Sequence, residues 1–296
     1  MTALILGFAE SMAPAHRLAE QLGMKAEKVQ VRRFPDQESL VTVPASASTV
    51  LIYRSLDDPD RKLIELFLAA SAARDLGARR VILVAPYLAY MRQDKAFHAG
   101  EAVSQGVIGG LLAAHFDALL TVDPHLHRVF DLSVVLPGIP AINLSAAPAL
   151  ASLVDTAGDP LIVGPDSESW PWTESIARPL GLSMLIGAKK RRGDRDVVLT
   201  LQDAERVRGR PAVLVDDLIS SGHTLIEATR LLRSAGATRV EAVVTHCLAM
   251  PADLARMAES GISRISASDS VPGPATRAFL APLLAEALTT SLLRQT

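Results

Sequence analysis

One short segment of the chain combines residue types that suit the binding of a phosphorylated sugar. The strand-like residues Pro211–Val215 are followed by two carboxylates, Asp216 and Asp217, and then by Ser220-Ser221-Gly222-His223-Thr224 at the start of a helical stretch. Glycine lets a backbone approach an anion closely, and the N–H groups at a helix N-terminus favour negative charge. The carboxylates would repel phosphate but accept hydrogen bonds from sugar hydroxyls. The segment therefore predicts a ribose-phosphate site rather than an ordinary capped helix.

Alternating strands and helices position this segment. Short β-branched runs predict strands, and Ala/Leu-rich stretches such as Arg61–Leu76 place apolar residues on one helical face. The clearest strands are Ala3–Gly7, Val50–Tyr53, Val81–Ala85, Ala118–Val122, Leu161–Gly164 and Ala212–Val215, with Val240–Thr245 and Ile262–Ser266 expected as well. The alternation indicates an α/β protein with mainly parallel sheets flanked by helices on both faces.

The chain length indicates two domains. Its 296 residues fit two units of about 150 residues each. A Pro/Gly-rich stretch, Leu136–Pro140, precedes the expected boundary, which divides the chain into domains 1–145 and 146–296. Helix–Gly–strand joints at residues 72–81 and 232–240 look alike, which fits either an internal duplication or the ordinary joints of α/β proteins.

Composition excludes several classes of protein. The net charge of −2 gives no global basic excess for nucleic acid or an anionic membrane. Cys247 is the single cysteine, so neither an intramolecular disulfide nor a multi-cysteine zinc site is expected. The sequence shows no basic leader and no apolar run of membrane-spanning length. These features predict a soluble cytoplasmic protein.

The ribose-phosphate segment resembles the phosphoribosyl pyrophosphate loop of type I phosphoribosyltransferases. That family usually has Thr-Gly-Gly-Thr where this chain has Ser221-Gly222-His223-Thr224, so His223 replaces a glycine. Further motifs resemble those of ribose-phosphate diphosphokinases over nearly the whole chain, and Gly100–Ser104 is similar to the archaeal-type (class III) branch. The resemblance implies two tandem phosphoribosyltransferase-like domains, with the ribose 5-phosphate loop in the second.

Two motifs in the first half are similar to the family's ATP-binding segments. Arg33-Phe34-Pro35-Asp36-Gln37-Glu38 resembles Arg-Phe-x-Asp-Gly-Glu, with Gln37 in place of the glycine. Residues 86–95 resemble the signature Pro-Tyr-x-x-Tyr-x-Arg-Gln-Asp-Arg/Lys. The resemblance implies an ATP site formed by Phe34, Asp36, Glu38, Arg92, Gln93 and Asp94.

The remaining site residues are also implied by resemblance. Thr121-Val122-Asp123-Pro124-His125 and Gly164-Pro165-Asp166 look like the family's magnesium segments, so His125 and Asp166 are expected to help hold Mg²⁺, with an outer-shell role for the imidazole. Ser167–Trp172 departs from the family pattern. In Lys189-Lys190-Arg191-Arg192, the residues Lys189 and Arg191 match the family's catalytic Lys-x-Arg spacing, and Lys190 with Arg192 is the competing register.

The implied reaction transfers the β,γ-diphosphoryl group of ATP to the C1 hydroxyl of ribose 5-phosphate. ATP and ribose 5-phosphate are the expected partners, Mg²⁺ the expected cofactor, and a homo-oligomer the expected assembly, with no nucleic acid or membrane partner. One alternative is a catalytically weak regulatory relative that assembles with a true synthetase, a reading supported by the altered loop Asp166–Trp172 and by His223. Another is a phosphoribosyltransferase that consumes phosphoribosyl pyrophosphate.

Overall fold

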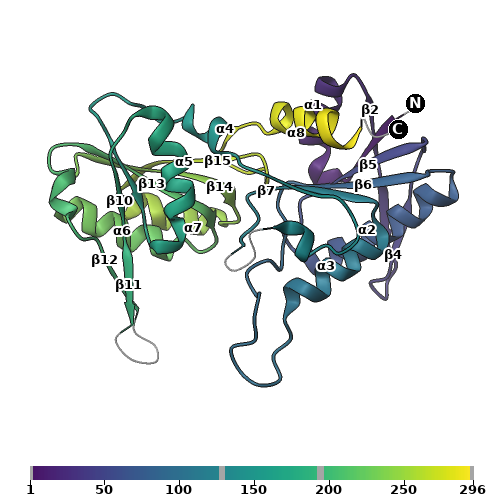
Figure 1. The fold of residues 1–296 in the computed structure, drawn as a ribbon, viewed down its shortest axis with the longest axis horizontal. Helices are drawn as coiled ribbons and strands as arrows, with labels where there is room; N and C mark the ends of the chain where they lie inside the picture. Colours follow the sequence, from purple (N-terminus) through teal and green to yellow (C-terminus); the bar gives the residue numbers. More distant parts are fainter. Residues whose placement is uncertain (1–2, 127–130, 192–196, 294–296) are drawn as a thin grey trace. The chain divides into compact units, whose positions relative to one another are not determined.

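A computed structural model describes residues 3–126, 131–191 and 197–293 of the chain (Figure 1). The chain forms two compact units: Met1–Ser145 with Leu280–Thr296, and Ala146–Phe279. Each unit is built on a six-stranded sheet and carries a separate two-stranded antiparallel pair. Every strand pair within the two large sheets is parallel, which confirms the α/β class with mainly parallel sheets.

The first unit has the strand order β2-β1-β5-β6-β7-β8. Its strands are β1 (Ala3–Gly7), β2 (Lys25–Lys28), β3 (Gln30–Arg33), β4 (Ser39–Thr42), β5 (Thr49–Tyr53), β6 (Arg80–Ala85), β7 (Ala118–Val122) and β8 (Ala141–Leu144). Its helical segments are η1 (Ala9–Ser11), α1 (Met12–Leu22), α2 (Pro59–Asp75), α3 (Ser104–His115), η2 (Leu132–Val134), α8 (Ala281–Ala287) and the π-helical η5 (Leu288–Leu292). The antiparallel pair β3–β4 lies outside the parallel sheet.

The second unit has the strand order β10-β9-β13-β14-β15-β16. Its strands are β9 (Leu161–Gly164), β10 (Met184–Ile186), β11 (Ala188–Arg191), β12 (Val197–Thr200), β13 (Pro211–Ile219), β14 (Arg239–Cys247), β15 (Ile262–Ser268) and β16 (Thr276–Ala278). Its helical segments are α4 (Ala147–Ala151), η3 (Ser167–Ser169), α5 (Trp170–Leu180), η4 (Ala204–Val207), α6 (His223–Ser234) and α7 (Pro251–Glu259).

Both faces of each sheet are covered. The central strands β5, β7 and β9 are buried at every position, as expected where helices pack on both sides of a parallel sheet. In the first unit, α1 and α8 lie on one face while α2 and α3 lie on the other (Figure 1). Right-handed crossovers that run in opposite directions along a sheet produce this arrangement.

The C-terminal segment differs from the sequence prediction, which assigned all of residues 146–296 to the second domain. Residues 280–296 group with the first unit. Helix α8 packs against α1, its residues Leu284 and Leu288 are fully buried, and Arg80 Nη1 donates a hydrogen bond to the carbonyl oxygen of Leu292 (2.5 Å). The apolar side chains of this segment therefore complete the core of the first unit.

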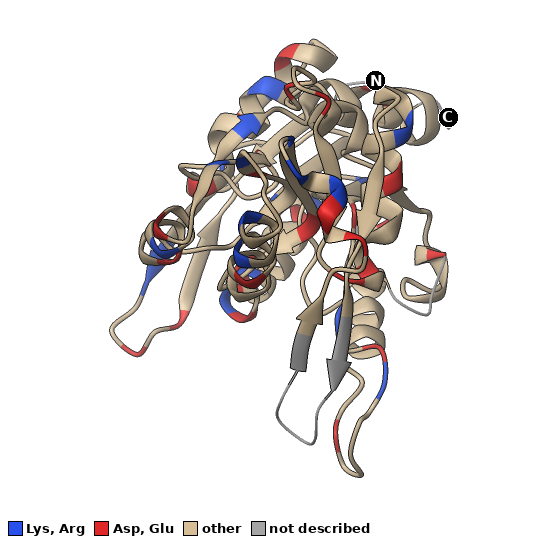
Figure 2. Ribbon diagram, turned by 90° about the vertical axis from the view of Figure 1, so that its left-hand side faces the viewer, with Lys and Arg blue, Asp and Glu red and all other residues tan. Residues whose placement is uncertain are grey.

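The distribution of charged residues agrees with the balanced composition. In the view of Figure 2, basic and acidic residues are interspersed along the ribbon. Among the residues that the structure describes, we find no helix whose length and apolar character would allow it to cross a membrane.

Candidate active site

Three aspartates lie near the carboxyl edge of the second sheet. Asp166 follows β9, whereas Asp216 and Asp217 lie in the neighbouring strand β13, and the pairing of Val163 with Leu214 brings the two strand ends together. Burial raises the pKa of Asp216 well above its usual value, and the charges of Asp217 and Asp166 raise it further. Neighbouring like charges that perturb a pKa are typical of functional sites.

Strand β13 is longer than the sequence predicts. The prediction ended it at Val215, just before the two carboxylates, but it continues to Ile219, although aspartate is disfavoured in strands. Leu218 and Ile219 pair with His246 and Cys247 of β14, and this pairing outweighs the local preference. Asp217 is consequently buried inside the sheet, with 3% of its surface exposed.

Asp166 has a defined structural partner as well as a site position. Its Oδ1 accepts hydrogen bonds from the backbone N–H groups of Glu168 (3.0 Å) and Ser169 (3.2 Å), so it caps η3. A side chain on Gly164 would collide with the hydroxyls of Ser169 and Thr173, at 2.5 and 2.6 Å from a Cβ atom. The segment Ser167–Trp172, which departs from the family's sequence pattern, is therefore an ordered helix start that packs tightly against the end of β9.

The predicted phosphate-binding segment forms the turn into α6. Gly222 is the N-cap residue with a φ angle of 75°, in the left-handed region that favours glycine. Ser220, Ser221 and His223 are exposed and Thr224 is partly exposed. The first backbone N–H groups of α6 lack partners within the helix and so suit an anion.

The replacement His223 is compatible with this turn. His223 is the first residue of α6, and the left-handed residue is the retained Gly222. The exposed His223 ring lies 3.4 Å from Glu227 Oε1, one helical turn later. A glycine is thus not required at position 223 for the backbone path seen here.

In the first unit, the predicted adenine-nucleotide segment is the turn between β3 and β4. Phe34, Asp36 and Glu38 are all exposed. Backbone bonds close the turn, and Gln37 adopts a φ angle of 75°, the conformation that favours the glycine it replaces. Arg33 Nη1 donates to the Gln37 carbonyl oxygen at 3.2 Å and fastens the turn to its strand.

The other predicted ATP residues follow β6, and His125 follows the neighbouring strand β7. The Ser104 hydroxyl donates to Gln93 Oε1 (2.6 Å), Arg92 is exposed, and Asp94 and His125 are partly buried. Because parallel strands end at the same edge of a sheet, these segments leave the first sheet on one side.

The predicted catalytic residues lie on the antiparallel pair β11–β12. Lys189 is paired with Leu199 and Arg191 with Val197, and the alternative Lys190 is paired with Val198. Arg192, the second residue of the competing register, lies outside the described residues.

Comparisons with known proteins agree with this architecture. Residues 3–115 match the family model described as the N-terminal domain of ribose phosphate pyrophosphokinase, and residues 138–264 match the phosphoribosyl transferase domain. The chain is 36% identical over 293 residues to a ribose-phosphate pyrophosphokinase of Methanopyrus kandleri, covering 96% of this chain and 98% of that protein. The chain belongs to the ribose-phosphate pyrophosphokinase family.

Two further relatives support the family assignment and the fold. A ribose-phosphate pyrophosphokinase of Methanobrevibacter smithii is 31% identical over 300 residues, with coverage of 96% and 99%. The phosphoribosylpyrophosphate synthetase structure from Mycobacterium smegmatis has a TM-score of 0.82 at 23% identity and covers 98% of both chains. This likeness shows that the two-unit fold is that of a known enzyme structure.

The metal expected for a ribose-phosphate pyrophosphokinase would need ligands beyond protein side chains. In the described ranges, no three His, Cys, Asp or Glu residues are grouped so that they could hold a metal ion by themselves. Carboxylate oxygens suit Mg²⁺, which also keeps waters and binds substrate phosphates. The like-charged group around Asp216 fits such a shared arrangement, because a cation would relieve its repulsion.

Sequence reasoning missed a polar cluster beside the family's ribose-phosphate loop. His246 is the penultimate residue of β14, next to β13, and its Nδ1 lies 2.8 Å from the Ser270 hydroxyl, which donates to the Thr245 carbonyl oxygen. His246 and Asp269 are buried, with 2% and 1% of their surfaces exposed. Polar residues just after apolar strands were the available signal, since α/β proteins bind ligands at carboxyl strand ends.

Proposed function

We propose that this chain is an ATP-dependent ribose-phosphate diphosphokinase that converts ribose 5-phosphate into phosphoribosyl pyrophosphate and releases AMP. The observation that carries the proposal is the second unit's strand–turn–helix segment. It combines Asp216 and Asp217 with the left-handed Gly222 at the start of α6. This segment belongs to a chain that is related over nearly its whole length to ribose-phosphate pyrophosphokinases.

The proposed binding of ribose 5-phosphate in the second unit follows from hydrogen-bonding capacity. Asp216 and Asp217 accept hydrogen bonds from ribose hydroxyls, and the loop residues hold the 5-phosphate: Ser220, Ser221, Gly222, His223 and Thr224. Backbone N–H groups and hydroxyls donate to phosphate oxygens, while the helix N-terminus adds a favourable field. Sugar hydroxyls that donate to Asp216 stabilise its ionised form, which burial and neighbouring charges disfavour.

The proposed ATP-binding residues lie in the first unit. Phe34 offers a ring for stacking on adenine, and Asp36 and Glu38 accept from its donors or from ribose hydroxyls. Arg92, Gln93 and Asp94 hold the remainder of ATP. The exposure of the β3–β4 turn leaves Phe34, Asp36 and Glu38 accessible to a ligand.

The reaction forms one P–O bond and breaks another. The C1 hydroxyl oxygen of ribose 5-phosphate attacks the β-phosphorus and loses its proton, and AMP leaves with the bridging oxygen. Positioning and charge neutralisation dominate such chemistry. Lys189 and Arg191 meet the negative charge that develops. Bound Mg²⁺ would neutralise charge on the triphosphate, and His125 in the first unit and Asp166 in the second are each proposed as residues that would help hold metal.

A direct assay tests this function. Purified chain is incubated with ATP, Mg²⁺ and ribose 5-phosphate, and AMP and phosphoribosyl pyrophosphate are quantified together. We expect the two products in equal amounts, with neither formed when ribose 5-phosphate is omitted. Release of ADP, or pyrophosphate release from added phosphoribosyl pyrophosphate and a base, would contradict the proposal and favour another kinase or a phosphoribosyltransferase. Complete inactivity of folded protein would favour the regulatory alternative.

We also propose that the protein works as a cytoplasmic homo-oligomer. Apolar side chains remain exposed on two adjacent helices of the first unit, Ile64 and Leu68 on α2 and Val107 and Leu111 on α3. Grouped apolar side chains are typical of surfaces that a protein partner covers. Light scattering coupled to size exclusion should give a mass that is a multiple of 31.5 kDa. A monomer at micromolar concentration would contradict the proposal.

A further inference from the structure

The two units share one topology. Their sheets have the same strand order when β1, β2, β5, β6, β7 and β8 are matched with β9, β10, β13, β14, β15 and β16. The antiparallel pair β3–β4 then corresponds to β11–β12. In each unit the chain leaves two adjacent central strands in opposite directions, from β1 to β2 and from β5 to β6, or from β9 to β10 and from β13 to β14. Crevices outside such a switch point are the usual ligand sites of open α/β sheets.

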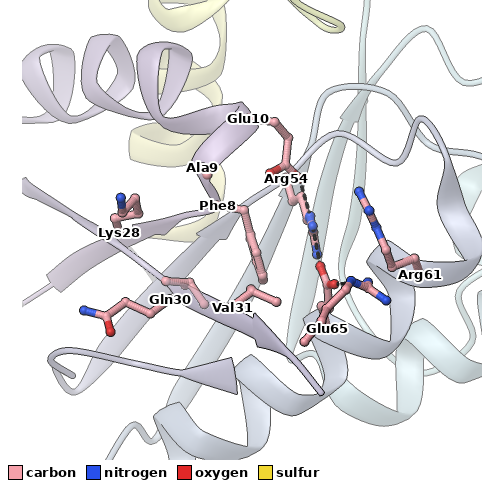
Figure 3. Close-up of a pocket in the computed structure, with 11 residues that line it drawn as sticks. Phe8, Ala9, Glu10, Lys28, Gln30, Val31, Arg54, Arg61 and Glu65 are labelled. Atoms are coloured by element: carbon pink, nitrogen blue, oxygen red, sulfur yellow. Dashed lines mark hydrogen bonds and ion pairs between the residues drawn. The ribbon is translucent and has the colours of Figure 1, made fainter. Parts of the chain in front are cut away.

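The switch point of the second unit carries the carboxylates and the loop described above. The switch point of the first unit carries a cavity of about 460 Å³ (Figure 3). Residues that follow β1 line it, namely Phe8, Ala9 and Glu10, together with Arg54, which follows β5. The cavity is therefore the topological counterpart of the proposed ribose-phosphate site.

A buried ion pair between Arg54 and Glu65 lies at the base of this cavity. Arg54 is 2% exposed and donates to Glu65 Oε2 (2.6 Å), Glu10 Oε1 (2.8 Å) and the Lys62 carbonyl oxygen (3.1 Å). Its guanidinium lies 3.7 Å from the centre of the Phe8 ring (Figure 3). Glu65 Oε1 also accepts from Arg33 Nη2 at 2.7 Å.

The charge of the lining favours an anion. Four cationic side chains, those of Lys28, Arg33, Arg54 and Arg61, face the cavity against two carboxylates, Glu10 and Glu65. Both carboxylates already bind Arg54, so they leave little negative charge for a ligand to oppose. Lys28 and Arg61 are exposed on the rim, and Arg61 Nη2 forms an ion pair with Asp58 Oδ2 at the long distance of 3.7 Å.

We propose that this cavity binds a phosphate ion or a small phosphomonoester, with Lys28, Arg33 and Arg61 as the phosphate-binding residues. Arginine and lysine are the residues that hold phosphate in proteins, and the volume lies within the range of small-molecule sites. Phe8, Ala9, Val29 and Val31 supply apolar walls for the body of an ester. The comparison with the second unit rests on the proposed function, whereas the charge and shape of the cavity stand independently of it.

Hydrogen exchange followed by mass spectrometry on the full chain tests the proposal and locates the ligand. The probes are inorganic phosphate and AMP, added separately. The test variant is Lys28→Ala/Arg61→Ala. Its control, Lys25→Ala/Arg79→Ala, removes two exposed cations of the same unit that do not line the cavity, one of them from the same strand. Both variants change the net charge equally, so general electrostatic effects cancel.

We expect the probe to slow exchange in peptides that cover residues 25–33 and 54–65. The concentration for half-maximal protection should rise by at least about tenfold in the test variant and stay unchanged in the control. A second variant, Ala9→Trp, fills the cavity without removing charge and should abolish the protection.

The two probes distinguish the sources of the phosphate group. Equal protection by both identifies the phosphate ion as sufficient, and protection by AMP alone shows that the apolar walls contribute; either result supports the site. Absence of protection at millimolar probe, or equal loss in the test and control variants, would overturn it. Protection confined to residues 215–226 would support the ribose-phosphate loop and refute the cavity, which keeps the two proposals separable.

Discussion

The carboxylates at the two switch points have opposite electrostatic environments. In the second unit, the carboxylates of Asp166, Asp216 and Asp217 repel one another, and burial raises the pKa of Asp216. In the first unit, burial acts to raise the pKa of Glu65, but hydrogen bonds and charge from Arg54 and Arg33 outweigh it and lower the pKa. The first arrangement suits hydroxyl donors or a cation, and the second suits a rigid wall with excess positive charge.

Lys189 and Lys190 give a residue-level test of the catalytic register. We expect Lys189→Ala to lower turnover by roughly two to three orders of magnitude, because it removes charge stabilisation of the transition state, while ribose 5-phosphate affinity changes little. Lys190→Ala is the matched control and should retain most activity. Steady-state kinetics and calorimetric titration provide the two readouts. If Lys190→Ala were the inactive variant, the competing register would be correct.

Glu65 allows a test through the pH dependence of stability. Because its pKa is lowered in the folded state, its contribution is complete above the unfolded pKa of about 4.5 and is lost as the pH falls through the folded value. Glu65→Gln should therefore lower the free energy of unfolding by about 3 kcal/mol at pH 7, since it breaks a buried ion pair, and by progressively less as the pH falls below about 4.5.

Urea unfolding of wild type and variant across this pH range measures the effect. Glu10→Gln is the control, because Glu10 also binds Arg54 but its side chain is 41% exposed. Glu10→Gln should lower the free energy of unfolding by less than about 1 kcal/mol. A Glu65→Gln effect that is independent of pH would show that its charge does not stabilise the fold.

At the scale of elements, the start of α6 depends on one glycine for two reasons. Gly222 has a φ angle of 75°, and a Cβ atom there would lie 2.3 Å from the sulfur of the buried Met257 on α7. The helix start that we propose as the phosphate site is therefore fixed by close packing as well as by backbone conformation.

Gly222→Ala should destabilise the protein by about 2–4 kcal/mol, because left-handed strain and a steric clash add together. Gly209→Ala is the control: Gly209 has a φ angle of 74°, but its Cβ position has no atom within 4 Å among the described residues. Gly209→Ala should lower the free energy of unfolding by about 1 kcal/mol. Thermal unfolding of both variants gives the comparison, and equal losses would mean that Met257 moves aside without cost.

At the scale of the whole molecule, the last helix belongs to the first unit. Leu284 and Leu288 are fully buried, although they follow the second unit in sequence. Leu284→Ala should cost about 2–5 kcal/mol, as cavity-forming substitutions do. Hydrogen exchange should accelerate in α1 and β2 and stay unchanged in β13–β15. Faster exchange restricted to the second unit would contradict the assignment of this segment.

Sequence patterns alone determined most of the architecture and the identity of the motif residues. Apolar strand runs between helical stretches are local signals, so β1, β7 and β9 begin and end where the sequence predicts. The Asp216–Thr224 segment was recognisable because residue type and order carry its chemistry.

Tertiary structure decided what depends on residues that are distant in the chain. Pairing with β14 extended β13 through two aspartates, and burial against the first unit's core assigned α8 to that unit. The His246–Ser270 contact and the Arg54–Glu65 cavity each join separate segments, so local spacing could not reveal them. Their positions follow from strand order, which is fixed by packing of the whole sheet and is not encoded in any single segment.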